Sequence, residues 1–374
     1  MVIGIPKETA AGENRVAVTP DTAAKLIKMG FEVRVEKGAG QNAHYTDEQY
    51  TKHGAAIAAT ATDLLGQSDI ILKVQKPSDA EIKQIKKGAL LISFVYGLNY
   101  PQVPKACAEA GVNLMSMDFI PRTTLAQKMD ALSSQYNIAG YKAVLMCAAA
   151  FGKMFPLMMT AAGTISPAKV VIMGAGVAGL QAIGTARRLG AVVEVSDVRA
   201  AVKEEVQSLG GKFIEVPGAE NMQDAGGYAK EASAEFLQKQ KELLFKHITE
   251  ADIVITTALV PGKKAPVLVT EEMIKHMRHG SIVLDMAVEF GGNCEVSEAG
   301  KTVTKHGVTI IGESNIPATV PTHASELYSK NLLALLQYIA KDGNLQLKLE
   351  DEIVKSALLV HNGVVVNERI KQVL

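Results

Sequence analysis

Hydrophobic and polar positions along the chain follow two periods, which predict strands and helices in turn. Short apolar runs predict strands at residues 2–5, 31–36, 69–75, 89–95 and 113–119. Between them, apolar residues recur at helical spacing, and we expect helices near 20–29, 78–85 and 103–110. Thr19 is a suitable N-cap for the first helix, and Pro20 suits its first position. This βαβ series predicts a parallel sheet covered by helices.

A second series of the same kind follows, with strands expected near 169–175, 191–197, 212–216, 252–259, 281–287 and 308–313. The fold class is therefore α/β, with two Rossmann-like, doubly wound parallel-sheet domains. Residues 124–159 and 324–340 contain few helix breakers and are expected to form long helices that bridge the two domains. The last segment of the chain shows no strand series of its own and is expected to pack back on the first domain. We therefore place one domain at 1–132 plus 318–374, and the other at 133–317.

Composition and charge exclude several classes of protein. A hydrophobic content of 48% with 21% charged residues argues against disorder. Lys plus Arg and Asp plus Glu each number 39, so no net field favours nucleic acid. Three well-separated cysteines indicate neither disulfides nor a zinc site, and we expect no metal. The apolar stretch 141–163 is interrupted by Lys142, Lys153 and Pro156, so no direct membrane span is expected.

The strongest motif is a G-x-G-x-x-G sequence formed by Gly174, Gly176 and Gly179, directly after a predicted strand. In this context the first glycine permits a tight turn, the second lets the backbone approach a pyrophosphate, and the third allows close helix packing. Val177 and Ala178 open the helix whose N-terminus would face the phosphates. The alternative is a tight turn that binds no ligand.

The second strand of this series ends at Asp197, 18 residues after Gly179. An acidic residue there is expected to accept hydrogen bonds from the adenosine ribose, which favours NAD over NADP. Val198 and Arg199 follow in the same loop. Arg199 could instead accept the 2′-phosphate of NADP, or it could be a solvated residue at a helix start.

Three further segments are candidates for contact with a nucleotide. Tyr228 follows two glycines and could belong to a lid that closes over the site, although a surface loop is the simpler interpretation. Thr257, Ala258 and Leu259 follow a later strand at the carboxyl edge, where open α/β sheets bind ligands. Asp285 ends another strand at that edge. Alternatively, the residues at these strand ends only terminate their strands and contact no ligand.

Several sequences resemble one known family over nearly the whole chain. Ile3-Gly-Ile-Pro-Lys-Glu8, Glu13-Asn-Arg-Val-Ala17 and Gly38-Ala-Gly40 resemble alanine dehydrogenases and the NAD(H)-binding component of proton-translocating NAD(P) transhydrogenases. Pro121-Arg122, Gln127, Met129-Asp130, Leu132-Ser-Ser-Gln135 and Met159-Thr-Ala-Ala-Gly-Thr164 resemble the transhydrogenase branch in particular.

The reactions of the two branches differ in whether they require proton transfer. Oxidation of an amino acid requires groups that anchor the substrate and transfer protons. Arg15 is retained, but Gln75 stands where the dehydrogenases have a lysine, and Tyr96 stands where they have a histidine. Hydride exchange between two nicotinamides requires mainly that the rings be positioned face to face. The missing proton-handling residues therefore fit a transhydrogenase.

The resemblance also implies roles for a short segment. Arg122, Asp130 and Ser133 would hold the dihydronicotinamide, and Gln127 would reach the nucleotide of the partner. Spacing alone would allow a simpler interpretation, in which Asp130 pairs with Arg122 at a helix start and Ser133 lies on the helix surface.

The family implies partners and a location as well. We expect a homodimer that binds NAD(H) and docks on a membrane-embedded component and an NADP(H)-binding component, both supplied by other chains. Its place would be cytoplasmic and peripheral on the bacterial inner membrane, or on the matrix side in mitochondria. Two alternatives stay open: an alanine dehydrogenase with altered catalytic residues, and a non-catalytic NAD-responsive module.

Overall fold

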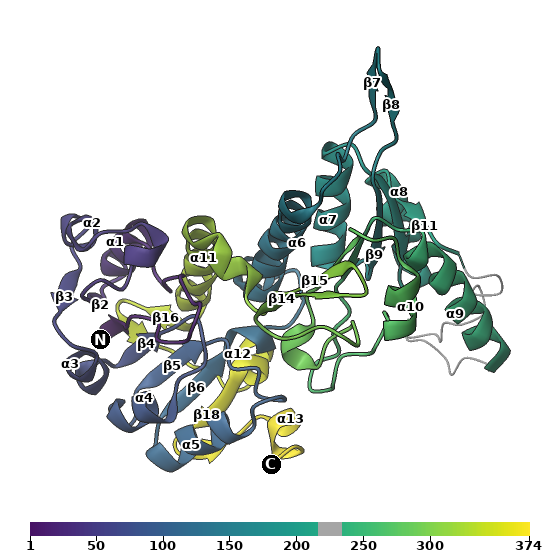
Figure 1. The fold of residues 1–374 in the computed structure, drawn as a ribbon. Helices are drawn as coiled ribbons and strands as arrows, with labels where there is room; N and C mark the ends of the chain where they lie inside the picture. The colour runs from purple at the N-terminus through teal and green to yellow at the C-terminus, as the bar shows by residue number, and fades with distance from the viewer. Residues whose placement is uncertain (216–233) are drawn as a thin grey trace. The chain divides into compact units, whose positions relative to one another are not determined.

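The computed structural model describes residues 1–215 and 234–374, without the side chains of 234–238 and 240. The chain divides into two compact units. Unit 1 is Met1–Gln135 with Pro317–Leu374, and unit 2 is Tyr136–Ile316. The purple and yellow ends of the ribbon in Figure 1 thus belong to the same unit.

The sheet of unit 1 has eight strands in the order β19-β18-β6-β5-β4-β1-β2-β3. Its six parallel strands are β1 (Val2–Ile5), β2 (Glu32–Glu36), β3 (Ala56–Ala58), β4 (Ile70–Leu72), β5 (Leu90–Ser93) and β6 (Asn113–Ser116). The strand order reverses between β1 and β4, as in dinucleotide-binding folds. The predicted strands are confirmed, while β3 was not predicted.

The expectation that the end of the chain adds no strands is wrong. β18 (Leu358–His361) pairs antiparallel with β6, and β19 (Val364–Val365) pairs with β18. A two-residue turn joins them, in which Asn362 and Gly363 both have positive φ, as a tight hairpin requires. The buried Leu358 to Val360 run is too short to stand out from a helix end by its pattern alone.

The helices of unit 1 are α1 (Pro20–Lys28), α2 (Asp47–Lys52), α3 (Ala61–Gln67), α4 (Asp79–Gln84), α5 (Gln102–Ala110), α11 (Pro321–Ile339), α12 (Glu352–Ala357) and α13 (Glu368–Lys371). Several of these helices begin at residues whose side chains cap them, among them α2, α3, α4, α12 and α13. Ser78 and Glu81 form a capping box at α4. Thr19 occupies the N-cap position of α1 as predicted, but its hydroxyl contacts Thr22 and Ser329 rather than the helix amides.

The sheet of unit 2 has seven strands in the order β11-β10-β9-β12-β13-β15-β14. The strands are β9 (Lys169–Met173), β10 (Val192–Ser196), β11 (Lys212–Phe213), β12 (Ile253–Thr256), β13 (Ile282–Asp285), β15 (Val308–Gly312) and the antiparallel β14 (Lys301–Lys305). The helices are α7 (Val177–Arg188), α8 (Lys203–Ser208), α9 (Ala234–Thr249) and α10 (Glu271–His276). The order reverses between β9 and β12, and the two doubly wound sheets predicted from the sequence are confirmed.

Both faces of each sheet are covered, because successive strand residues belong to different hydrophobic clusters. In unit 2, Val170 and Ile172 pack in one cluster, whereas Val171 and Met173 pack in the other. In unit 1, Ile71 of β4 lies on the opposite side from its neighbours in the strand. Burial on both faces explains why these strands are almost uniformly apolar.

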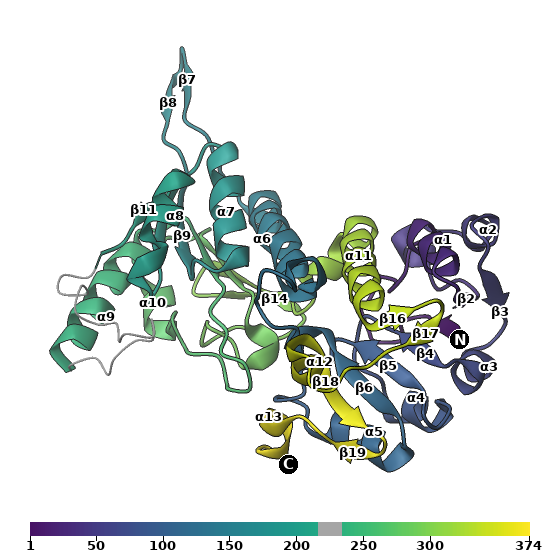
Figure 2. The same ribbon diagram turned by 180° about the vertical axis from the view of Figure 1, so that it is seen from behind.

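The long helix predicted for residues 124–159 is shorter than expected. Helix α6 runs over Ala131–Ala150, and a 3-10 turn at Gln127–Met129 precedes it. The Asp130 carboxylate accepts the N–H of Ser133 at 2.9 Å, which ends the loop and begins the helix. After the helix, a hairpin of β7 (Met158–Thr160) and β8 (Gly163–Ile165) projects from unit 2 in both views (Figures 1 and 2). Helix α11 covers the range in which a long helix was predicted, and it lies within unit 1.

None of the helices in the described residues is long and apolar enough to cross a membrane.

Candidate functional site

The turn between β9 and α7 is built by two glycines with distinct steric roles. Gly174 has φ +110°, which favours glycine, and its N–H donates to the Ser196 carbonyl at 2.8 Å. A Cβ on Gly179 would lie 1.9 Å from the Gly174 carbonyl oxygen. The predicted tight turn and close helix packing are therefore both present.

The space in front of Gly176 is open, because a Cβ there would meet no atom within 4 Å. Gly176 is the N-cap of α7 and brings no side chain to its amides. The amides of Val177 and Ala178 lie in the first turn, where a helix leaves N–H groups without intrahelical partners. An open, side-chain-free helix N-terminus fits the pyrophosphate of a dinucleotide.

Asp197 follows β10 and fixes the glycine turn. Its Oδ2 accepts the N–H of Ala175 at 2.7 Å, and its carboxylate also accepts the N–H of Arg199 at 2.8 Å. The Arg199 guanidinium pairs with Asp197 at 2.9 and 3.0 Å. Burial raises the pKa of Asp197, but these hydrogen bonds outweigh it and bring the pKa below its ordinary value. Asp197 is therefore an ionised acceptor at this edge.

The other predicted cofactor residues of unit 2 lie around the same edge. Thr257 follows β12, and its Oγ1 donates to the Gly174 carbonyl at 3.1 Å. Ala258 and Leu259 continue the loop and are half-buried, whereas Val198 is exposed. Tyr228, the lid candidate, lies outside the described residues.

One buried residue next to this loop was not predicted. Asn293 is fully buried, and its side-chain amide bonds both the N–H and the carbonyl of Ala258. The sequence signal for this residue is weak. It consists of a Gly-Gly-Asn run after the β13 strand. Gly291 and Gly292 both have positive φ there.

The four predicted catalytic residues of unit 1 lie within one short segment before and inside α6. The structure brings Asp130 and Ser133 together, since the Ser133 hydroxyl donates to the Asp130 carboxylate at 2.6 Å. Arg122 lies in the preceding loop and Gln127 in the 3-10 turn, and both side chains are exposed. The Asp130 carboxylate therefore accepts hydrogen bonds from the first turn of α6.

Charged side chains fill the carboxyl edge of the sheet in unit 1. The buried Arg15 guanidinium binds Glu13 at 2.6 and 2.8 Å and Gln135 at 2.8 Å. The Gln75 amide donates to the same Glu13 at 2.9 Å. Burial lowers the pKa of Arg15, but the charge of Glu13 outweighs that effect and raises it. Arg15 is therefore a cation that an internal carboxylate neutralises.

A second buried cation lies nearby in the fold of unit 1. Lys73 Nζ contacts Glu81 at 2.7 Å and Glu8 at 3.3 Å. Glu8 Oε2 lacks a hydrogen bond of good geometry despite the short contact. Desolvation raises the pKa of Glu8, so this carboxyl is the weakly held member of the group.

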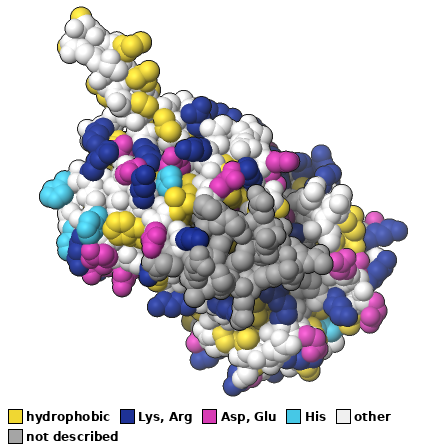
Figure 3. All heavy atoms as spheres, turned by 90° about the vertical axis from the view of Figure 1, so that its right-hand side faces the viewer, with side chains coloured by type: hydrophobic (Ala, Val, Ile, Leu, Met, Phe, Trp, Pro, Cys, Tyr) yellow, Lys and Arg dark blue, Asp and Glu magenta, His cyan; other side chains and the backbone are white. Residues whose placement is uncertain are grey.

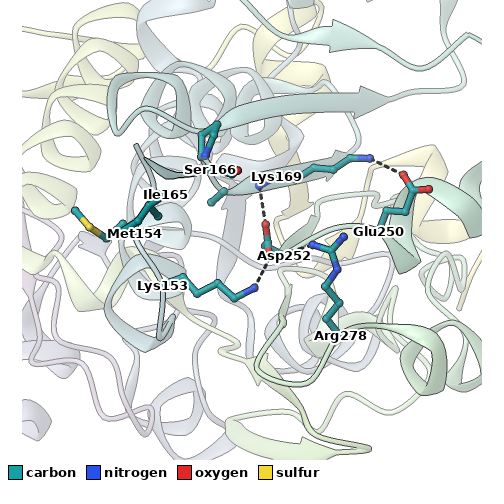
Figure 4. Close-up of a pocket in the computed structure, with 10 residues that line it drawn as sticks. Lys153, Met154, Ile165, Ser166, Lys169, Glu250, Asp252 and Arg278 are labelled. Atoms are coloured by element: carbon teal, nitrogen blue, oxygen red, sulfur yellow. Dashed lines mark hydrogen bonds and ion pairs between the residues drawn. The ribbon is translucent and has the colours of Figure 1, made fainter. Parts of the chain in front are cut away.

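A cavity of about 360 Å³ lies at the amino-terminal edge of the sheet in unit 2, away from the glycine turn. Figure 4 shows Lys153 and Arg278 pointing toward Asp252, which lies just before β12. Asp252 accepts from Lys153 Nζ at 2.9 Å and from the N–H of Lys169 at 3.0 Å. Ligands of doubly wound sheets bind at the opposite, carboxyl-terminal edge, so this cavity does not mark the nucleotide site.

Two family profiles cover almost the whole chain. The N-terminal domain of the alanine dehydrogenase/PNT family matches residues 4–139, and the C-terminal domain of that family matches residues 143–368.

Sequence identity to individual relatives differs between the two branches of the family. The chain is 50% identical to an NAD(P) transhydrogenase alpha-subunit chain of Rhodospirillum rubrum, over 98% of each sequence. The solved transhydrogenase structure from Sinorhizobium meliloti is similar with a TM-score of 0.86 at 43% identity, covering 98% of this chain and 99% of that one. A solved L-alanine dehydrogenase is similar with a TM-score of 0.83 but only 26% identity, covering 100% of this chain and 99% of that one. The fold is common to both branches, whereas the sequence is closer to the transhydrogenases.

Proposed function

The chain belongs to the alanine dehydrogenase/PNT family, and from this premise we propose that it is the NAD(H)-binding component of a proton-translocating NAD(P) transhydrogenase. It takes part in direct, reversible hydride transfer between NAD(H) bound here and NADP(H) bound on a partner component. A membrane component couples this transfer to proton translocation.

One observation carries the choice between the two branches of the family. By the resemblance to the family, Gln75 takes the place of a dehydrogenase lysine, and in the structure its amide donates to Glu13. An amide side chain does not exchange a proton with a substrate at neutral pH, so this position offers no acid–base group. When bound, the nicotinamide supplies a hydride at its C4 atom, and no group of the chain needs to move a proton.

The chemistry of Asp197 supports NAD(H) as the resident nucleotide. Its ionised carboxylate repels a 2′-phosphate and accepts hydrogen bonds from ribose hydroxyls. Arg199, the group that could have bound that phosphate, is paired with Asp197. NADP(H) therefore belongs to the partner component.

We assign the reacting end of the nucleotide to the segment that leads into α6. Arg122, Asp130 and Ser133 hold and orient the dihydronicotinamide, and Gln127 contacts the nucleotide of the partner. The hydrogen bond from Ser133 to Asp130 fixes the orientation of that carboxylate. Orientation of this kind accelerates a bimolecular step without proton transfer.

The projecting hairpin supports a homodimer. Residues 156–166 contain no charged side chain, and Leu157, Met159 and Ile165 are 55%, 76% and 44% exposed. Figure 3 shows hydrophobic side chains along this projection. A bare two-stranded hairpin with apolar edges is poorly stable in water unless another chain covers it. Met159→Lys should therefore shift the dimer toward monomer in analytical ultracentrifugation, whereas Thr160→Lys, on a polar position of the same strand, should do so less.

The partners and location follow from the same proposal. The dimer docks on the membrane-embedded component and on the NADP(H)-binding component. It lies peripherally on the cytoplasmic face of a bacterial inner membrane, or on the matrix face in mitochondria.

The decisive experiment mixes the purified chain with the NADP(H)-binding component and follows hydride transfer from NADH to an NADP⁺ analogue. Transfer is expected, and Gln127→Asn should lower its rate while NADH still binds. Binding of both nucleotides without any transfer would falsify the proposal and favour an NAD-responsive module. Alanine-dependent NAD⁺ reduction by the chain alone would favour the dehydrogenase alternative.

A further inference from the structure

The loop that follows β12 in unit 2 is held by one buried side chain. Asn293 Oδ1 accepts the N–H of Ala258 at 3.0 Å. Its Nδ2 donates to the carbonyls of Ala258 at 2.9 Å and of Pro266 at 2.8 Å. The amide therefore contacts both ends of residues 258–266, which we call the clasped loop.

Few other contacts of buried residues hold the clasped loop in its conformation. Residues 260–264 are all exposed, and Gly262 has φ +75°. Ala265 is the buried residue of the segment, and its N–H donates to the Phe290 carbonyl at 2.8 Å. A loop with little buried apolar surface opens easily unless specific hydrogen bonds hold it.

Asn293 is itself fixed by a buried carboxylate. Asp285, at the end of β13, accepts the N–H of Ala287 at 2.9 Å and of Cys294 at 3.0 Å. It also accepts the hydroxyl of Ser297 at 2.7 Å. These bonds shape the segment that carries Asn293, so the side-chain amide is presented in a preset orientation.

The clasped loop starts beside the glycine turn. Thr257, the residue before it, donates its N–H to the Met173 carbonyl at 2.9 Å and its hydroxyl to the Gly174 carbonyl at 3.1 Å. The direction in which Ala258 and Leu259 leave the sheet is therefore set on one side by the glycine turn and on the other by Asn293.

From this arrangement we infer that Asn293 is a positioning residue for NAD(H): it acts through Ala258 and holds the loop at the edge of the nucleotide site in its binding conformation. It acts without contacting the nucleotide, because its side-chain amide is fully buried and is bonded to the loop. The inference rests on the proposed function, because it assumes that the edge formed by residues 257–259 faces bound NAD(H).

The test compares NADH binding by Asn293→Ala, Asn293→Asp and a matched control in the full-length chain. Asp252→Ala is the control, because it also removes a buried hub of hydrogen bonds from unit 2, but at the opposite edge of the sheet (Figure 4). Circular dichroism and thermal unfolding establish that each variant is folded. The NADH dissociation constant is then measured by nucleotide fluorescence.

Asn293→Ala is expected to raise the NADH dissociation constant about tenfold, whereas Asp252→Ala should leave it within about twofold even if stability falls equally. Hydrogen exchange should rise in residues 258–266 of Asn293→Ala while strands β9 and β10 keep their protection. In Asn293→Asp, a carboxylate faces two carbonyl oxygens, and protonation restores one donor. Its affinity for NADH, relative to the unmodified chain, should therefore improve as the pH falls from 8 to 5.

The other possible outcomes are equally decisive. Asn293→Ala with unchanged affinity and unchanged exchange in the clasped loop overturns the inference and leaves the proposed function intact. Equal losses of affinity in Asn293→Ala and Asp252→Ala also overturn it, because the effect would then be one of general stability. Failure of the unmodified chain to bind NADH overturns the proposed function and this inference together. If Asn293→Ala does not fold, Asn293→Ser takes its place with the same expected result.

Discussion

The carboxyl-terminal edges of the two sheets share a reversal of strand order but differ in the residues that build them. In unit 2 the edge is a turn of glycines with open space in front of Gly176 and helix amides behind it. In unit 1 the same edge is filled by Arg15, Lys73 and the carboxylates that neutralise them. The turn in unit 2 is open in front of Gly176, whereas the charged groups that follow β1 and β4 in unit 1 are paired with one another.

The difference shows that the fold creates the crevice and that local side chains decide its use. Glycines leave the backbone amides at the start of α7 uncovered by side chains, and such amides attract an anionic ligand. Buried charges must instead be paired within the protein, because leaving one unpaired is costly. Four substitutions or conditions test this contrast, from the largest expected effect to the smallest.

The largest effect is expected where a buried ion pair is broken in unit 1. Arg15→Met leaves Glu13 buried without its main cation, and should lower the free energy of unfolding by about 3 to 5 kcal/mol. Urea unfolding followed by circular dichroism measures the loss. The double variant Glu13→Gln with Arg15→Met should recover some of it. A loss below about 1 kcal/mol in Arg15→Met would show that this edge is not held by the pair.

A side chain added at the glycine turn of unit 2 should weaken nucleotide binding strongly. The added Cβ of Gly179→Ala would lie 1.9 Å from the Gly174 carbonyl, so the turn must shift. We expect the NADH dissociation constant to rise at least about a hundredfold, which corresponds to about 2.8 kcal/mol. Gly184→Ala on the same helix is the control, since its nearest neighbour is a side-chain atom 4.0 Å away. Normal NADH binding by Gly179→Ala would remove the steric basis of the proposed site.

A smaller effect is expected from one hydroxyl beside the turn. Thr257→Val keeps the shape of the side chain but removes the donor to the Gly174 carbonyl. Loss of one such bond should weaken NADH binding about fivefold in calorimetric titration. Thr249→Val, which removes a similar hydroxyl bond to the Phe245 carbonyl in α9, should leave the affinity unchanged. Equal effects of the two substitutions would contradict a specific role for Thr257.

The smallest effect concerns pH. The pKa of Asp197 is lowered in the folded chain, so its contribution to stability is complete above its unfolded pKa of about 3.9. That contribution is lost only as the pH falls below this value and through the folded pKa. Between pH 8 and pH 5, the Asp197→Asn variant and the unmodified chain should therefore show a constant ratio of NADH affinities. A ratio that changes within this range would show that Asp197 titrates there.

Much of the fold could be predicted because it depends on patterns within single segments. Uniformly apolar runs marked the central strands of both sheets, and the glycine spacing marked the turn before α7. Segments with weak local patterns were missed or misjudged. The β18–β19 hairpin is short, and the start of α6 depends on a single Asp130 cap that periodicity does not show.

The sequence by itself determined that the chain has two doubly wound sheets and where a dinucleotide turn must lie, because hydrophobic period and glycine sterics act over a few neighbouring residues. Only the tertiary structure decided which polar groups meet. Asn293 bonds Ala258 across 35 residues, and Arg15 bonds Gln135 across 120. Such pairings depend on how strands and loops distant in the sequence are brought together. Patterns among neighbouring residues therefore do not predict them.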